Sequence, residues 1–173
     1  DDFGIVFAAG HAQSQQIVRC KACGLLYANP RTGELDDALV AQHDPDYLPQ
    51  MLQREHDPRM DKESLQVRDY AGTRDFLAGL FPRRGRLLEI GCGLGFLLDY
   101  FRRDGWRVQG VDPDPLMARH AEQVLGVGVS ATTLAQAALD EGTFDVVLMM
   151  NVIEHLHDPT AASTRAASPA LAP

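Results

Sequence analysis

The sequence predicts an α/β fold, with a mostly parallel sheet flanked by helices, from one stretch near its middle. Leu87, Leu88 and Ile90 form a short apolar run, which is typical of a strand buried on both faces. Three glycines follow at every second position, and residues 94–101 then carry leucine and phenylalanine at helical spacing. A strand, a tight glycine turn and a helix, in that order, form the unit that parallel sheets repeat.

Before this unit, residues 1–58 are predicted to form a small appendage and a linker. Residues 5–9 and 16–19 are predicted strands around a polar turn, and Cys20 and Cys23 stand in a tight Cys-x-x-Cys knuckle. Two thiolates take only two of the four positions of a structural zinc site. Because the sequence holds no second Cys-x-x-Cys, the pair is an orphan half-site and we expect no bound metal.

The proline-punctuated residues 31–58 are predicted as a linker with a short helix near residues 35–42. The main domain is predicted over residues 59–158 and begins with a helix in residues 61–81. The apolar positions of that helix are Leu65, Tyr70, Phe76, Leu77 and Leu80.

After the glycine turn, residues 107–111 are predicted as the next strand, ending in Asp112. Asp114 is a predicted helix cap with Pro115 at the first helical position. The inner face of that helix is predicted to hold Met117, Ala121, Val124 and Leu125. A weak strand is predicted at residues 127–129, a helix within 130–141 and a clear apolar strand at 144–150.

The glycine turn is flanked by acidic residues that restrict its ligand. Phe96 stands where a dinucleotide fingerprint needs its third glycine, and no Gly-Lys-Ser/Thr of a phosphate loop is present. Glu89 beside the turn would repel a pyrophosphate but suits an ammonium or sulfonium group. Asp112 lies about twenty positions after the turn, where a neighbouring parallel strand presents a carboxylate to ribose hydroxyls. Alternatively, Asp112 only starts the turn before Pro113.

The stretch Glu-x-Gly-x-Gly-x-Gly at residues 89–95 resembles the first motif of the class I S-adenosylmethionine-dependent methyltransferases. Residues 152–155 (Val-Ile-Glu-His) are similar to a later segment of that family. Gly24 to Pro30, after the cysteine pair, resembles a subgroup with an N-terminal Cys-x-x-Cys knuckle. The resemblance implies a Rossmann-like fold.

The resemblance also implies which residues meet the cofactor S-adenosylmethionine and which act in catalysis. The expected cofactor-binding residues are Glu89, Gly91, Cys92, Gly93, Gly95, Asp112, Pro113, Thr133 and Asn151. His155 is the candidate base and Glu154 its neighbour, because histidine titrates near neutral pH. An alternative is that both residues only cap or orient their loop.

The family's sheet continues beyond its fourth strand, so the resemblance implies that this chain is truncated at both ends and lacks C-terminal strands. Residues 159–173 are almost entirely Ala, Ser, Thr and Pro, which predicts a low-complexity tail without regular structure. The strand at 144–150 is then an exposed edge, which predicts self-association. We expect weak cofactor binding and little turnover.

Composition sets the outer limits of these predictions. The 173 residues carry 16 Lys and Arg against 24 Asp and Glu, a net charge of −8, which argues against a nucleic-acid partner. No stretch approaches the ~20 apolar residues of a membrane span. The first residues lack the features of a secretory signal and the cysteines form no disulfide framework, so the predicted location is cytoplasmic.

The sequence therefore predicts methyl transfer from S-adenosylmethionine to a small-molecule acceptor. Two other functions stay open. One is an S-adenosylmethionine-binding fragment without catalysis. The other is an NAD-dependent oxidoreductase, against which Glu89 and Phe96 argue.

Overall fold

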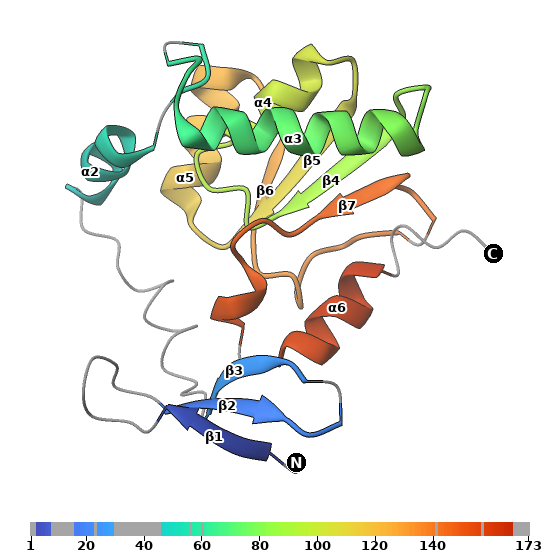
Figure 1. Cartoon of the computed structure of the whole chain (residues 1–173). Helices are drawn as coiled ribbons and strands as arrows, with labels where there is room; N and C mark the ends of the chain where they lie inside the picture. Colours follow the sequence, from blue (N-terminus) through green and yellow to red (C-terminus); the bar gives the residue numbers. More distant parts are fainter. Residues whose placement is uncertain are drawn as a thin grey trace.

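The structure is a computed structural model, and it describes residues 3–7, 16–22, 24–29, 46–55, 57–59, 61–140, 142–156 and 158–167. Its centre is a four-stranded sheet in the order β6-β5-β4-β7, in which every neighbouring pair is parallel (Figure 1). The strands are β4 (Arg86–Ile90), β5 (Arg107–Asp112), β6 (Val129–Ala131) and β7 (Val146–Leu148). The predicted α/β, Rossmann-like class is confirmed.

Helices cover both faces of this sheet, as the apolar run in β4 predicts. Successive strand side chains point to opposite faces. Leu87 joins a first core with the helices α3, α4 and α5, whereas Leu88 and Ile90 join a second core that includes Ala166 of α6. Figure 1 shows α6 apart from the other helices, beyond β7. The helices are α2 (Tyr47–Arg54), α3 (Leu65–Leu80), α4 (Phe96–Arg103), α5 (Pro115–His120) and α6 (Pro159–Ala167).

A separate antiparallel sheet forms the N-terminal appendage. It contains β1 (Phe3–Phe7), β2 (Gln16–Cys20) and β3 (Leu26–Asn29), with β2 in the centre. The predicted hairpin is present, and β3 is an additional strand. The Gly24 N–H donates to the Cys20 carbonyl at 2.9 Å and closes the knuckle. Cys23 lies outside the described residues, so the orphan half-site stays a prediction.

Asp114 caps α5 as predicted, because its carboxylate accepts hydrogen bonds from the Leu116 and Met117 N–H groups at 2.8 and 3.3 Å. The predicted inner face is wrong at Val124, which is 52% exposed. The segment after α5 (Ala121–Leu125) is a π-helix, whose wider turn shifts the phase of the side chains. Sequence periodicity assumes an unbroken α-helix and therefore misplaces this residue.

The predicted unstructured tail is wrong for residues 159–167, which form α6. The Asp158 carboxylate accepts from the Ala161 N–H at 2.9 Å at the start of the helix. Alanine has a high helix propensity. Ala166 is buried in the second core, and the Arg165 guanidinium donates to the Ala137 carbonyl at 2.7 Å. These contacts attach α6 to the main domain.

Three further predictions of local structure need correction. The helix predicted within residues 130–141 is absent from their described positions, which contain only turns and the end of β6. The Gln136 and Ala137 N–H groups both donate to the Thr133 carbonyl, and no helix continues from there. The predicted helix near residues 35–42 lies outside the described residues; the described part of the predicted linker contains α2, whose Tyr47 packs on the first core. The strand at 144–150 is shorter than predicted. Of the apolar positions noted in the α3 sequence, Tyr70 and Leu77 are buried, whereas Leu65, Phe76 and Leu80 are exposed.

In the part of the chain that the structure describes, no helix is both long enough and apolar enough to cross a membrane.

Gly95 begins α4 and tests how this core is packed. Its φ of +82° is left-handed, and an added Cβ would lie 2.7 Å from the Ala121 Cβ. Gly126 has a similar φ of +69° with open space around it. Alanine at Gly126 therefore adds backbone strain alone, whereas alanine at Gly95 adds strain and overpacking.

We expect Gly95→Ala to lower the free energy of unfolding by about 1–3 kcal/mol more than the control Gly126→Ala, as measured by urea denaturation. An equal loss for the two variants would contradict the close packing of Gly95 against the π-helix.

Candidate functional site

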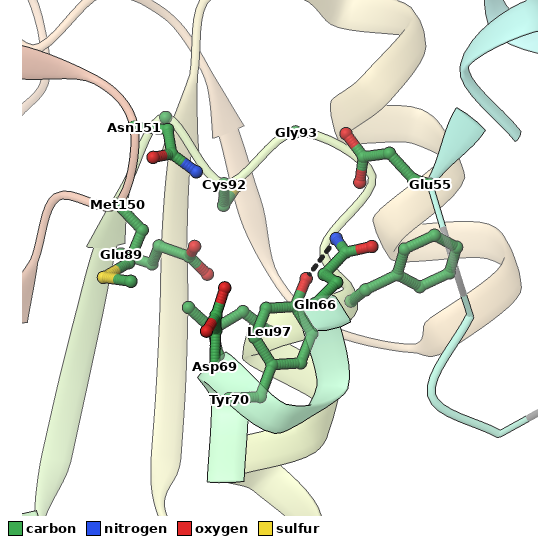
Figure 2. Close-up of a pocket in the computed structure, with 12 residues that line it drawn as sticks. Glu55, Gln66, Asp69, Tyr70, Glu89, Cys92, Gly93, Leu97, Met150 and Asn151 are labelled. Carbon is green, nitrogen blue, oxygen red and sulfur yellow. Dashed lines mark hydrogen bonds between the residues drawn. The ribbon is translucent and has the colours of Figure 1, made fainter. Parts of the chain in front are cut away.

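A cavity of about 210 Å³ lies at the carboxyl end of β4, where ligands bind in open α/β sheets (Figure 2). The β4–α4 turn forms one wall, with Glu89, Gly91, Cys92 and Gly93. The segment after β7 contributes Met150 and Asn151, and the end of α2 and the first half of α3 complete the enclosure. No lysine, arginine or histidine lines the cavity in the described part of the chain.

The glycine turn is fixed by hydrogen bonds that it donates to the neighbouring strand β5. The Gly91 N–H donates to the Val111 carbonyl at 2.7 Å, and the Gly93 N–H donates to the Asp112 carboxylate, also at 2.7 Å. Gly93 has a φ of +50°, and a Cβ added there would meet no atom within 4 Å. The turn therefore presents bare backbone to the cavity at Gly93.

Glu89 is the buried carboxyl of the site. The Glu89 side chain lies on the side of the sheet that α3 and α4 cover. Glu89 is only 4% exposed, and its Oε2 atom has no hydrogen-bond partner in the described part of the chain. Burial raises the pKa of the Glu89 carboxyl well above its usual range, and the nearby Asp112 and Glu55 raise it further. Burial of Glu89 thus favours the protonated acid, and a cation placed beside it would favour the carboxylate.

The polar residues that α2 and α3 bring to the cavity were missed by sequence reasoning. They are Glu55, Gln66, Asp69 and Tyr70. Gln66 donates from Nε2 to the Tyr70 hydroxyl at 2.6 Å, and burial raises the pKa of Tyr70 (Figure 2). Positions 66, 69 and 70 share one helix face, a spacing that could have indicated a polar face on α3.

Asp112 is the last residue of β5 and is hydrogen-bonded to the glycine turn. One carboxylate oxygen accepts from the Gly93 N–H, and the other accepts from the Asp114 N–H at 2.9 Å. The residue is 7% exposed, and burial raises the pKa of its carboxyl. Each oxygen keeps acceptor capacity. The position of Asp112 is therefore compatible with both predicted roles, binding the ribose hydroxyls and starting the turn before Pro113.

The structure brings together only part of the predicted cofactor-binding set. Glu89, Gly91, Cys92, Gly93 and Asn151 line the cavity. Cys92 is buried, and this burial raises the pKa of its thiol. Asn151 has a left-handed φ of 54°, the only such non-glycine residue in the described ranges.

Four other predicted residues do not line the cavity. Gly95 faces the core against Ala121, and Asp112 is behind the turn. Pro113 follows Asp112, and Thr133 donates from its hydroxyl to the Gln136 amide oxygen at 3.3 Å. The enclosed cavity beside Glu89 is thus lined by five of the nine predicted cofactor-binding residues.

Glu154 and His155, the predicted catalytic pair, lie in a short 3₁₀ helix after β7 (Ile153–His155). Both side chains are exposed, and neither lines the cavity. The preceding Val152 packs on the glycine turn, since a Cβ on Gly91 would lie 2.3 Å from its Cγ2. The pair is therefore next to the site along the chain but outside its enclosed part.

Comparison with known proteins agrees with this architecture. A family model described as a methyltransferase domain matches residues 61–173, well over half of the chain. The chain belongs to this family. The predicted membership in the class I S-adenosylmethionine-dependent methyltransferases is confirmed. The narrower assignment to a subgroup with an N-terminal Cys-x-x-Cys knuckle stays a prediction.

Individual relatives cover part of the chain. A ubiquinone biosynthesis O-methyltransferase of Cereibacter sphaeroides is 43% identical over 97 residues, which are 53% of this chain and 39% of that protein. One from Methylocella silvestris is 40% identical over 78 residues, covering 42% of this chain and 30% of that protein. The chain thus aligns with less than half the length of these curated relatives.

A solved structure extends the similarity to the backbone. It is CalS10 with bound S-adenosylmethionine, an amino pentose methyltransferase from Micromonospora echinaspora involved in calicheamicin biosynthesis. Its TM-score is 0.53 at 26% sequence identity, and the match covers 63% of this chain and 46% of that chain.

The raised pKa of Glu89 makes the stability of this domain pH-dependent. A carboxyl whose folded-state pKa lies above its unfolded value of 4.5 stabilises the fold fully below that value. This contribution is lost as the pH rises through the folded-state pKa.

We therefore expect Glu89→Gln to reduce the decline in the free energy of unfolding between about pH 5 and pH 8, as measured by urea denaturation without ligand. Glu154→Gln, which changes an exposed carboxyl, should leave the profile of the parent unchanged. A parent profile retained by Glu89→Gln would contradict the burial of this group as an acid.

Proposed function

We propose that this chain binds S-adenosylmethionine in the cavity beside Glu89 and transfers its methyl group to a small-molecule acceptor. The observation that carries the proposal is the buried Glu89 carboxyl, whose Oε2 is without a partner in the described residues. It faces a cavity that also holds Glu55 and Asp69 and no basic side chain among the residues described. Such a cavity favours a ligand with positive charge and excludes a pyrophosphate.

The residues present fit this cofactor on two counts. The ammonium group of its methionine part would neutralise the orphan Glu89 carboxylate in a water-poor setting, where charge-assisted hydrogen bonds are strong. Gly93 offers open backbone at the cavity wall, so that a ligand meets no side chain there. Asp112, already oriented by the turn, is the proposed partner of the ribose hydroxyls.

The cofactor supplies an electrophilic methyl group on a sulfonium, so the task of the chain is mainly to bind and align. The walls from α2 and α3 enclose the Glu89 side of the cavity. His155 is the proposed base for an acceptor that must lose a proton, with Glu154 beside it. Both residues are accessible to an acceptor that approaches from the side of the 3₁₀ helix.

The acceptor is proposed only as a small molecule. The curated relatives are named as O-methyltransferases of ubiquinone biosynthesis, and CalS10 as an amino pentose methyltransferase. Hydroxyl and amine acceptors therefore both belong in the first screen.

Several narrower predictions accompany this proposal. They are a cytoplasmic location, no nucleic-acid or membrane partner, an N-terminal cysteine knuckle without zinc, and self-association through the edge of the sheet. The last has support in the position of β7 at one edge of the four-stranded sheet. Size-exclusion chromatography with light scattering tests it, and a concentration-independent monomer would contradict it.

Isothermal titration with S-adenosylmethionine, S-adenosylhomocysteine and NAD tests the proposed ligand. We expect both sulfur compounds to bind, and NAD to leave the affinity for S-adenosylhomocysteine unchanged because it does not compete for the cavity beside Glu89. Transfer of a radiolabelled methyl group to a panel of phenols and amines then tests catalysis. Binding without transfer to any of these acceptors would favour the alternative of a non-catalytic cofactor-binding fragment.

Gly93 allows a matched test of where the ligand lies. Gly93 and Gly126 both have left-handed φ angles and open space, so alanine causes similar strain at either position. Only Gly93 lines the cavity. We expect Gly93→Ala to weaken S-adenosylhomocysteine binding about tenfold or more and Gly126→Ala to leave it unchanged, as measured by calorimetry. Equal affinities for the two variants, both folded, would remove Gly93 from the ligand site.

A further inference from the structure

A second cavity, of about 460 Å³, lies between α3, the segment before it and the end of α4. Its lining contains five basic side chains, which define it here as the basic groove: Arg59, Lys62, Arg68, Arg74 and Arg103. This concentration of positive charge stands out in a chain whose net charge is −8. Nothing in the methyl-transfer proposal uses it.

The carboxylates in the groove do not balance these cations. Only Asp99 and Asp104 line it. Asp99 is shared by two arginines, with Arg102 at 2.5 Å and Arg103 at 2.8 Å. Asp104 is engaged by Arg84, which lies outside the lining, at 2.7 Å. Positive charge therefore remains in excess inside the groove.

Two of the cations are available for a ligand without breaking any contact. Lys62 and Arg68 are exposed, and neither side chain has a hydrogen-bond or ion-pair partner within the described ranges. Arg59 is held by Asp57 and Arg74 by Asp75, in partly or largely exposed pairs. The Arg74–Asp75 pair is the more exposed of the two, and exposed ion pairs contribute little stability, so the Arg74 guanidinium can turn toward an anion at small cost.

The groove also has an apolar side. Val67 and Ala71 of α3 line it together with Tyr100 of α4, whose hydroxyl accepts from Arg74 Nη1 at 3.3 Å. Its volume is within the range of small-molecule sites. A ligand that matches both parts carries several negative charges on one end and an organic group on the other.

We propose that the basic groove binds a soluble organic phosphate of about the size of a nucleoside diphosphate. Four of the five cations are arginines, and the planar guanidinium fork matches phosphate oxygens with two parallel hydrogen bonds. A diphosphate supplies enough charge for the groups that lack partners. The acidic cavity beside Glu89 excludes the same ligand, so the two sites take opposite charges from different faces of α3.

Calorimetric titration of the whole chain with pyrophosphate at low salt tests this proposal, without and with saturating S-adenosylhomocysteine. We expect one site per chain whose affinity does not change when S-adenosylhomocysteine is present. ADP should bind more tightly than pyrophosphate under saturating S-adenosylhomocysteine, because its nucleoside reaches the apolar side of the groove.

The test variant is Lys62→Gln with Arg68→Gln, and the control is Arg83→Gln with Arg107→Gln, which removes equal charge from exposed positions elsewhere. We expect the first pair to weaken pyrophosphate binding about tenfold or more and the control pair to leave it within about twofold. Equal affinity for both pairs, displacement by S-adenosylhomocysteine, or no saturable binding by the parent would each overturn the proposal.

Discussion

The buried carboxyl of Glu89 is the constraint on which the site depends. It occupies a position on the central strand β4 where the alternation of the strand points the side chain toward α3 and α4. An apolar residue there would extend the first core. The Glu89 carboxyl instead leaves a desolvated acceptor at the end of the sheet, because its Oε2 atom has no partner among the described residues, and burial raises its pKa.

The surrounding elements isolate this group rather than neutralise it. The glycine turn brings bare backbone to one side of the cavity, and Asp112 fixes the turn by accepting the Gly93 N–H. On the other side, α3 contributes Tyr70 and Asp69. The same helix presents its cations to the basic groove on another face. Asp69 and two arginines of α3, Arg68 and Arg74, thus line different cavities.

The central strand, the glycine turn and the cap of α5 could be predicted from sequence because each follows from local chemistry. Apolar residues on both faces, glycines at left-handed positions and Asp114 before Pro115 need no distant partner. Cavity residues such as Glu55 and Gln66 could not be predicted in this way, since only tertiary packing brings α2 and α3 over β4. The helix α6 was missed because its alanines show no apolar period, and its stability rests on Asp158 and on contacts with Ala137.

The exposure of Val124 has a related cause, because one π-helical turn changes which side chains face the core. Likewise, the position of His155 depends on a 3₁₀ turn that sequence periodicity does not reveal. The cavity residues of β4 and its turn were therefore easier to predict than the location of the proposed base. The former belong to a strand and the turn that follows it, whereas the proposed base lies in a short 3₁₀ helix.

The central claim is that Glu89 is a neutral acid in the free protein and becomes a carboxylate when a cationic ligand binds. Calorimetry of S-adenosylhomocysteine binding at a series of pH values above the unfolded value of 4.5, in buffers with different ionisation enthalpies, measures the protons released. The account predicts proton release by the parent and its loss in Glu89→Gln. It also predicts no release with methylthioadenosine, which lacks the ammonium group. Equal proton release by the parent and by Glu89→Gln would contradict the account.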